Sequence, residues 1–331
     1  MAVSLAFIGL KGHQYIILDA IPDLPNVQIV AVADDDSEAL KRIHGFPGAT
    51  AATKAYLDYR ELLEKHTPDI VVEAGTDRDR AEVLTTCAQR GVHIICEKPL
   101  AIDLPGLERV ENAVTEAGIT CSALLTMRCE PPYLGLRAAM AAGVVGEVTQ
   151  VGGQKSYRLG ERPSWQKSRD TFSGIIPYIG IHMMDLLRWT TGREFVEVMA
   201  YGSNVGHPDM GDLEDNACVI ARLDNGASAA FRLDYCRPAA APTHGDDRLR
   251  IAGNRGVIEA KDDMVTTIMH DEGPREVPLP PPVNFFADFL QAIQTNSDPF
   301  IPFADCVRIT DVVLRAHESA QTGRPVRLSA H

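Results

Sequence analysis

A lysine at the end of an apolar run is the first candidate for chemistry. Glu97-Lys98-Pro99 directly follows Val92-His93-Ile94-Ile95-Cys96, which reads as a buried parallel strand. Ligands bind at the carboxyl ends of strands in open α/β sheets, and a proline restricts the residue before it to an extended conformation. Lys98 is therefore predicted to hold its ammonium group at a ligand-binding edge. A solvated lysine in an ordinary turn is the alternative.

A histidine followed by an aspartate three residues later is the second candidate. His182 and Asp185 lie within Gly180-Ile181-His182-Met183-Met184-Asp185, a helical pattern. A histidine can accept or donate a proton near neutral pH, although its apolar neighbours equally suit a core histidine. No further metal-ligating residues cluster near this pair, so we predict no metal site.

The turn after the first predicted strand could bind a dinucleotide. Gly9-Leu10-Lys11-Gly12-His13-Gln14 lies where a dinucleotide fold has G-x-G-x-x-G, but only its first glycine is in register. Gly12 can still form the sharp turn, and Lys11 could contact a phosphate. A generic strand-to-helix turn is an equally good interpretation of these six residues.

The second predicted strand ends in Asp34-Asp35-Asp36, at the separation expected of the acid that binds an adenosine ribose. A carboxylate there accepts hydrogen bonds from ribose hydroxyls and repels a 2′-phosphate, which favours NAD over NADP. Asp34 is our candidate, while Asp36 or Ser37 is expected to cap the following helix.

The elements that must position these residues alternate in the first part of the chain, as in βαβ units. The predicted strands are 4–9, 28–34, 70–74, 93–96 and 120–125, and the predicted helices are a short one near 14, then 37–43, 58–66, 80–89 and 104–117. We expect a doubly wound parallel sheet over residues 1–125.

The remainder, residues 126–331, has longer strands joined by turns. Strands are predicted at 147–157, 195–203, 217–223, 228–235, 248–252, 256–260 and 264–269, and helices at 133–142, 182–189, 285–294 and 305–322. Asp224-Asn225-Gly226 is a strong hairpin signal. We therefore expect an α+β domain with antiparallel pairing.

Composition limits the partners. The chain has 331 residues and a net charge of -13, which argues against nucleic acid or an anionic membrane and leaves a small molecule. Its seven cysteines are scattered without a C-x-x-C pair, and no apolar run is long enough to span a bilayer. These features indicate reduced thiols and a cytoplasmic location.

Several motifs together resemble the glucose-fructose oxidoreductase, inositol dehydrogenase and MocA-like (Gfo/Idh/MocA) family. They extend over essentially the whole chain: Cys96-Glu97-Lys98-Pro99-Leu100, Thr126-Met127-Arg128, Gly143-Val144-Val145-Gly146-Glu147, Gly180 to Asp185, and Thr322-Gly323-Arg324. The resemblance implies an N-terminal Rossmann domain, a C-terminal α+β domain with a large, mostly antiparallel open sheet, and NAD-dependent oxidation or reduction of a carbohydrate or polyol. It also implies a homodimer or homotetramer formed through the open face of that sheet.

The resemblance assigns the proton to His182 and the reacting oxygen to Lys98, which lies beside the nicotinamide in that family. The implied cofactor-binding residues are Gly9, Lys11, Gly12, His13, Asp34, Thr76, Asp77, Glu97, Lys98 and Arg128. The implied substrate-binding residues are Tyr157, Trp165, Tyr178, His182 and Asp185. Arg158 falls in the same region, and for Tyr157 and Arg158 sheet packing or surface ion pairing is the simpler interpretation.

The chain departs from the family pattern at a residue that would assist proton transfer by His182. Active members usually carry an aspartate four residues before the histidine, whereas this chain has Tyr178, a phenol without negative charge. Asp185 could substitute for it. Together with Lys11 and Gln14, this departure leaves two alternatives open: a non-catalytic nucleotide-responsive regulatory protein, and a lyase or glycosidase that uses NAD transiently.

Overall fold

A computed structural model describes residues 2–329, which form two compact units. The first comprises Met1–Leu124 and Asn284–Arg308, and the second comprises Leu125–Val283 and Ile309–His331. The first boundary lies one residue from the predicted division. Residues 284–308, expected in the second domain, group with the first unit, where the backbone oxygen of Ile301 accepts a hydrogen bond from Ser122 Oγ at 2.8 Å.

The first unit contains a six-stranded parallel sheet in the order β3-β2-β1-β4-β5-β6. Its strands are β1 (Val3–Ile8), β2 (Val27–Ala33), β3 (Ala49–Tyr56), β4 (Ile70–Glu73), β5 (His93–Cys96) and β6 (Cys121–Ala123). The strand order reverses between β1 and β4, and this switch point is where doubly wound sheets bind ligands. The sequence analysis missed β3, because this edge strand exposes most of its small and polar side chains and has no apolar pattern.

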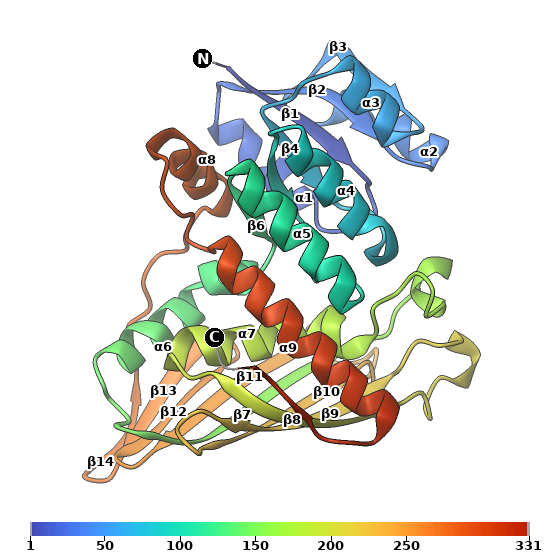
Figure 1. The fold of residues 1–331 in the computed structure, drawn as a ribbon. Helices are drawn as coiled ribbons and strands as arrows, with labels where there is room; N and C mark the ends of the chain where they lie inside the picture. The colour runs from blue at the N-terminus through green and yellow to red at the C-terminus, as the bar shows by residue number, and fades with distance from the viewer. Residues whose placement is uncertain (1, 330–331) are drawn as a thin grey trace. The chain divides into compact units, whose positions relative to one another are not determined.

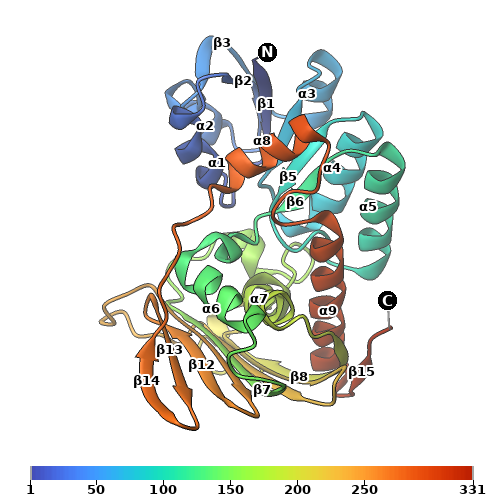
Figure 2. The same ribbon diagram turned by 90° about the vertical axis from the view of Figure 1, so that its left-hand side faces the viewer.

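Helices cover both faces of this sheet (Figure 1). They are α1 (Tyr15–Ala20), α2 (Ser37–Leu40), α3 (Tyr59–Lys65), α4 (Asp77–Gln89), α5 (Leu104–Ala117) and α8 (Phe285–Thr295). α4 and α5 pack side by side, and α8 packs against α1 (Figure 2). The expected cap of α2 is confirmed, since Asp36 accepts a hydrogen bond from the backbone N–H of Glu38 at 2.9 Å. That helix ends three residues earlier than predicted, at Leu40.

The second unit contains a nine-stranded sheet in the order β14-β13-β12-β11-β7-β10-β9-β8-β15. Its strands are β7 (Val148–Tyr157), β8 (Phe195–Ser203), β9 (Asn216–Leu223), β10 (Ser228–Asp234), β11 (Gly245–Gly253), β12 (Gly256–Lys261), β13 (Met264–Met269), β14 (Glu272–Glu276) and β15 (Val326–Arg327). β7 and β10 pair in parallel and the other neighbours are antiparallel. The predicted hairpin joins β9 to β10. The short edge strands β14 and β15 were not predicted.

Helices cover one face of this sheet and leave the other open (Figures 1 and 2). They are α6 (Pro131–Ala141), α7 (Ile181–Thr191) and α9 (Phe303–Thr322), the last of which belongs to this unit from Ile309 onward. Strand alternation explains the asymmetry: in β9, Val219 is buried while Ile220 is 58% exposed.

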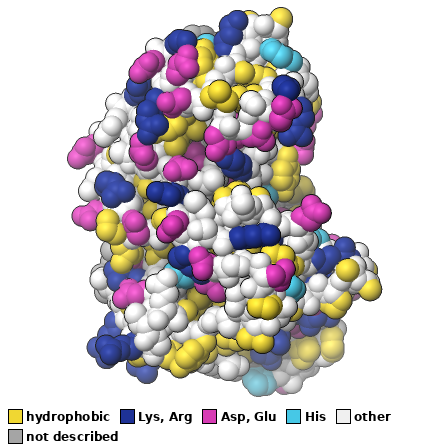
Figure 3. Space-filling view, turned by 90° about the vertical axis from the view of Figure 1, so that its right-hand side faces the viewer, with side chains coloured by type: hydrophobic (Ala, Val, Ile, Leu, Met, Phe, Trp, Pro, Cys, Tyr) yellow, Lys and Arg dark blue, Asp and Glu magenta, His cyan; other side chains and the backbone are white. Residues whose placement is uncertain are grey.

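Within residues 2–329, no helix is long and apolar enough to cross a membrane. On the face drawn in Figure 3, acidic and basic side chains are interspersed.

Candidate active site

The glycine turn after β1 is built by close backbone contact at the switch point. Gly9 has φ +82°, and a Cβ atom there would lie 2.3 Å from the backbone nitrogen of Gly75, which follows β4. Only glycine avoids both the positive φ penalty and this clash. The turn therefore brings the carboxyl ends of β1 and β4 together, as predicted for a dinucleotide-binding edge.

Asp34 holds this turn from the end of β2. The side chain is buried, and its oxygens accept hydrogen bonds from the backbone N–H groups of Leu10 at 2.6 Å and Asp36 at 2.7 Å. Burial raises the pKa of Asp34 despite these bonds. Each carboxylate oxygen can accept a further hydrogen bond, so the contacts are compatible with the predicted ribose role.

Lys11 forms an ion pair with Asp35, and the hydrogen bond from Lys11 lowers the pKa of that carboxyl group. Lys11, which is predicted to contact a phosphate, thus already has an acidic partner, Asp35.

A cavity of about 410 Å³ opens at the carboxyl ends of β1, β2 and β4. Its walls include Gly9, Lys11, Asp34, Asp35, Gly75 and Thr76. The donor set fits a dinucleotide: carboxylates suit ribose hydroxyls, an ammonium group suits phosphate, and glycine backbone permits close approach. Asp58 and Tyr59 also line the cavity and escaped the sequence analysis, because they follow the unrecognised strand β3.

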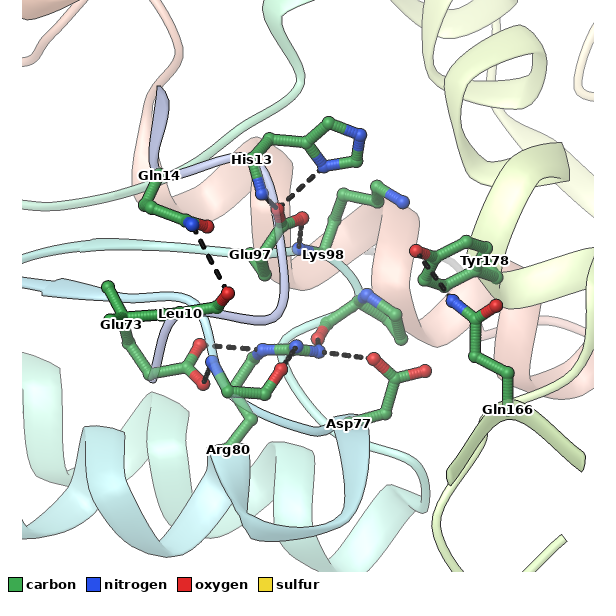
Figure 4. Close-up of polar contacts among 12 residues, drawn as sticks. Leu10, His13, Gln14, Glu73, Asp77, Arg80, Glu97, Lys98, Gln166 and Tyr178 are labelled. Atoms are coloured by element: carbon green, nitrogen blue, oxygen red, sulfur yellow. Dashed lines mark hydrogen bonds and ion pairs between the residues drawn. The ribbon is translucent and has the colours of Figure 1, made fainter. Parts of the chain in front are cut away.

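Glu97 links the glycine turn to the end of β5. Its side chain is buried and accepts hydrogen bonds from the backbone N–H of His13 and, at 2.6 Å, from His13 Nδ1 (Figure 4). Burial alone would raise its pKa, but the bonds from His13, with the charges of Lys98 and Arg80, lower the pKa of Glu97 to about 2. A Cβ atom on Gly12 would lie 2.5 Å from Glu97 Oε1, so this carboxylate explains the second glycine.

The segment carrying Lys98 is held from the opposite side by Arg80. Lys98 is 2% exposed and follows β5 directly, and the next peptide bond, to Pro99, is cis. The backbone oxygen of Pro99 accepts a hydrogen bond from Arg80 Nη1 at 2.8 Å, while Arg80 Nε donates to Glu73 Oε2 at 2.7 Å (Figure 4). Arg80 and Glu73 were not predicted as site residues. The only sequence signal was a glutamate closing the apolar run Ile70–Glu73.

Asp77, one of the implied cofactor-binding residues, is fully buried and pairs with the same guanidinium at 3.1 Å. Arg80 therefore compensates its charge. Thr76 Oγ1 donates to Asp79 Oδ2 at 2.8 Å at the start of α4.

In the second unit, Tyr178 and His182 lie one turn apart on a continuous helical segment. Tyr178 belongs to a π-helical turn, Ile176–Gly180, that runs directly into α7, and His182 is the second residue of α7. Such turns occur often at functional sites. Tyr178 Oη accepts a hydrogen bond from Gln166 Nε2 at 3.1 Å (Figure 4), and its ring contacts those of Trp165 and Phe172.

Asp185, on α7, is engaged by another predicted site residue, Arg128. Arg128 Nε and Nη2 donate to the two carboxylate oxygens at 2.8 and 2.6 Å, and both side chains are almost fully buried. The guanidinium also lies 5.5 Å from the centre of the Trp189 ring. This geometry favours a positioning role for the pair, fixing α7 and with it His182.

Tyr157 packs between His244, with ring centroids 5.0 Å apart, and the Lys155 ammonium, 4.7 Å from its ring centre. Among residues 2–329, no three His, Cys, Asp or Glu side chains form a group that could hold a metal ion.

Comparison with known proteins agrees with this arrangement. Residues 3–124 match an oxidoreductase family with an NAD-binding Rossmann fold, and residues 133–259 match the GFO/IDH/MocA C-terminal domain. A myo-inositol dehydrogenase from Streptomyces leeuwenhoekii is 29% identical over 264 residues, which cover 78% of this chain and 76% of that protein.

Solved structures share the whole fold. A Thermotoga maritima protein, provisionally named an oxidoreductase, is 31% identical with a TM-score of 0.91, covering 98% of this chain and 100% of that one. A levoglucosan dehydrogenase in complex with NADH has a TM-score of 0.84 at 20% identity, covering 99% and 100% of the two chains, and shows the fold alone. The chain therefore belongs to the GFO/IDH/MocA family of oxidoreductases, and its first unit is the family's NAD-binding Rossmann fold.

Proposed function

We propose that this protein interconverts a secondary alcohol and a ketone on a sugar, sugar acid or cyclitol with NAD, using Lys98 and His182 at the reacting carbon. The observation that carries the proposal is the buried position of Lys98 directly after Glu97, whose carboxylate binds the glycine turn. Relatives named as dehydrogenases of myo-inositol and D-apiose support the substrate class.

When bound, NAD would supply the acceptor for the hydride that leaves the substrate carbon in the oxidation. The hydroxyl proton must leave at the same time, and the imidazole of His182 is the base suited to take it near neutral pH. The Lys98 ammonium stabilises the negative charge that develops on the oxygen. In the reduction, His182 returns the proton to that oxygen.

Replacing Lys98 tests the proposal. Lys98→Ala should lower kcat by about 10²- to 10⁴-fold, because the oxygen loses its charge stabilisation, while NAD still binds. Steady-state kinetics and calorimetric titration of NAD measure the two effects. Lys41→Ala, which removes an exposed lysine paired with Glu38, is the matched control. Full activity in Lys98→Ala would refute the role.

Tyr178 favours two alternative functions, because its phenol cannot supply the negative charge of the family's usual aspartate. A nucleotide-responsive regulatory protein would bind NAD but turn over no sugar when absorbance of reduced nicotinamide is followed. A lyase or glycosidase using NAD transiently would form product without net reduction, which chromatography of the reaction mixture would reveal.

We also propose a reducing compartment, the cytoplasm. Residues 2–329 contain no disulfide bond, and five of the seven cysteines are buried. Immunodetection in fractionated cells of the source organism tests this location.

A further inference from the structure

Within residues 2–329, the guanidinium groups of Arg158 and Arg162 in the second unit form no ion pair. Arg158 donates from Nη2 to the backbone oxygen of Ala241, and Arg162 donates from Nη1 to Gln166 Oε1 at 3.3 Å. Within residues 2–329, no carboxylate lies within ion-pair distance of either side chain, and the Nε atoms of both are buried without a hydrogen-bond partner. A buried guanidinium nitrogen without a hydrogen-bond partner is unusual in a folded protein.

Both arginines lie near the segment Tyr235-Cys236 and near His244. Arg158 forms a backbone bridge with Cys236, and the Arg162 guanidinium lies 4.3 Å from the ring centre of the adjacent residue, Tyr235. After its partial burial, the charges of Arg162 and Arg158 are the main causes that lower the pKa of His244. The surrounding segment, residues 155–169, contains five Lys or Arg residues and one acidic residue.

Two of the other three cations of this segment already have acidic partners. Lys155 pairs with Asp247 at 2.7 Å, and Arg169 pairs with Glu214.

A chain of hydrogen bonds joins Arg162 to the proposed reaction site. Arg162 contacts Gln166, and Gln166 donates to Tyr178, one helical turn before His182. Because residue 178 is a tyrosine and not an acid, its side chain does not compensate the charges of Arg158 and Arg162.

We propose that the substrate carries an anionic group, a carboxylate or a phosphate ester, that is bound by Arg162 and Arg158. This rests on the proposed function and narrows its substrate class to anionic sugars. A guanidinium group donates charge-assisted hydrogen bonds to either oxyanion.

Matched sugars test the proposal. With saturating NAD, kcat/KM is measured for D-glucose, D-glucuronate and D-glucose 6-phosphate, and for D-galactose and D-galacturonate. The anionic member should exceed its neutral parent by about 10- to 100-fold, as expected of charge-assisted hydrogen bonds, and the phosphate arm identifies which anion is preferred.

Variants locate the effect. Arg162→Gln should raise KM for the anionic sugar by about tenfold or more and leave the neutral parent within about twofold, and Arg162→Lys should recover part of the loss. Arg193→Gln, which removes an arginine already paired with Glu147, is the control and should change neither. A purely structural role would affect both sugars equally.

Calorimetric titration of the same sugars, with and without NAD, decides the inference even if none of them is turned over. Tighter binding of an anionic sugar than of its neutral parent supports the inference. Three results overturn it: binding or turnover of neutral sugars alone, equal binding of an anionic sugar and its neutral parent, or no binding of any anionic sugar. Turnover of neutral sugars would leave the proposed function intact, whereas failure of NAD to bind would count against the proposed function only.

Discussion

At the scale of single residues, the nucleotide turn combines one buried carboxylate with one exposed ion pair. The Asp34 carboxylate accepts hydrogen bonds from the backbone N–H groups of Leu10 and Asp36. The Asp35 side chain is 74% exposed and forms an ion pair with Lys11. The two acids therefore control cofactor choice differently: Asp34 shapes the turn and offers its remaining acceptor sites to the ribose, and Asp35 determines whether Lys11 is available to a further anion.

Asp35→Ala should accordingly improve the use of NADP. Removing the acid leaves the Lys11 ammonium available for a 2′-phosphate, so kcat/KM for NADP should rise about tenfold while the value for NAD changes less. Kinetics with the two cofactors side by side measure this, with Asp19→Ala on α1 as a control for lost negative charge. Wild-type protein that uses NADP as well as NAD would contradict the ribose role of Asp34.

Glu97 should make stability depend on acidity. Its pKa is about 2 in the folded protein against an ordinary value of 4.5, so its contribution is present above the ordinary value and is lost as pH falls through the folded value. Glu97→Gln removes that contribution. Urea unfolding should show a stability difference between wild type and variant at about pH 6 that shrinks at about pH 3.

The buried Glu73, whose pKa is raised by burial, contributes in the opposite sense. Glu73 is present in both proteins, and the charge of Glu97 is only a minor cause of its raised pKa, so most of its contribution cancels in the comparison. A difference that stays constant with pH would contradict the assignment to Glu97.

At the scale of secondary structure elements, Arg80 joins three pieces of the first unit. From α4 it bonds the last residue of β4, Glu73, and the backbone oxygen of Pro99 beyond β5. The side chain is 1% exposed, so its charge is stabilised by these neighbours, by Asp77 and Glu97, and by the backbone oxygen of Gly75. The segment bearing Lys98 thus depends on a helix that contributes no side chain to the proposed chemistry.

Arg80→Met should destabilise the protein by about 3–5 kcal/mol, because Glu73 and Asp77 would remain buried without their cation. Arg60→Met removes an exposed arginine paired with Glu82 and should cost much less stability, because water screens this pair. Denaturant unfolding of both variants provides the comparison. Equal small losses would show that the buried network contributes little.

At the scale of the whole molecule, the second unit leaves one face of a nine-stranded sheet uncovered. That face exposes Tyr201 and Ile220 by 63% and 58%, and a groove of about 400 Å³ runs past Ile220 and Met199. Exposed apolar side chains on a broad sheet are typical of protein–protein contact. We therefore propose that two or four copies of this chain assemble through it.

Ile220→Glu should weaken that assembly, because a charge would be buried at the contact. Light scattering should give a mass two or four times the 36.0 kDa of one chain for the wild type and a lower mass for the variant at the same concentration. Arg222→Glu, on the same face but already polar and exposed, should have a smaller effect. A monomeric wild type at micromolar concentration would contradict the proposal.

The order of most strands and helices could be predicted from the sequence. So could the glycine turn, the acid after β2, the lysine after β5 and the β9–β10 hairpin. These features are local: strand and helix periodicity, capping and turn chemistry depend on residues within a few positions of one another. Strands without an apolar pattern, β3 among them, were missed for the same reason.

The contact partners of the charged side chains become apparent from the tertiary structure alone. Glu97 meets His13 across 84 residues, Arg128 meets Asp185 across 57, and residues 284–308 return to the first unit. A buried charge is stable only beside a partner, and which partner it meets depends on how the strands and helices are ordered in space. The sequence therefore names candidate residues for the site, and the fold determines their contacts.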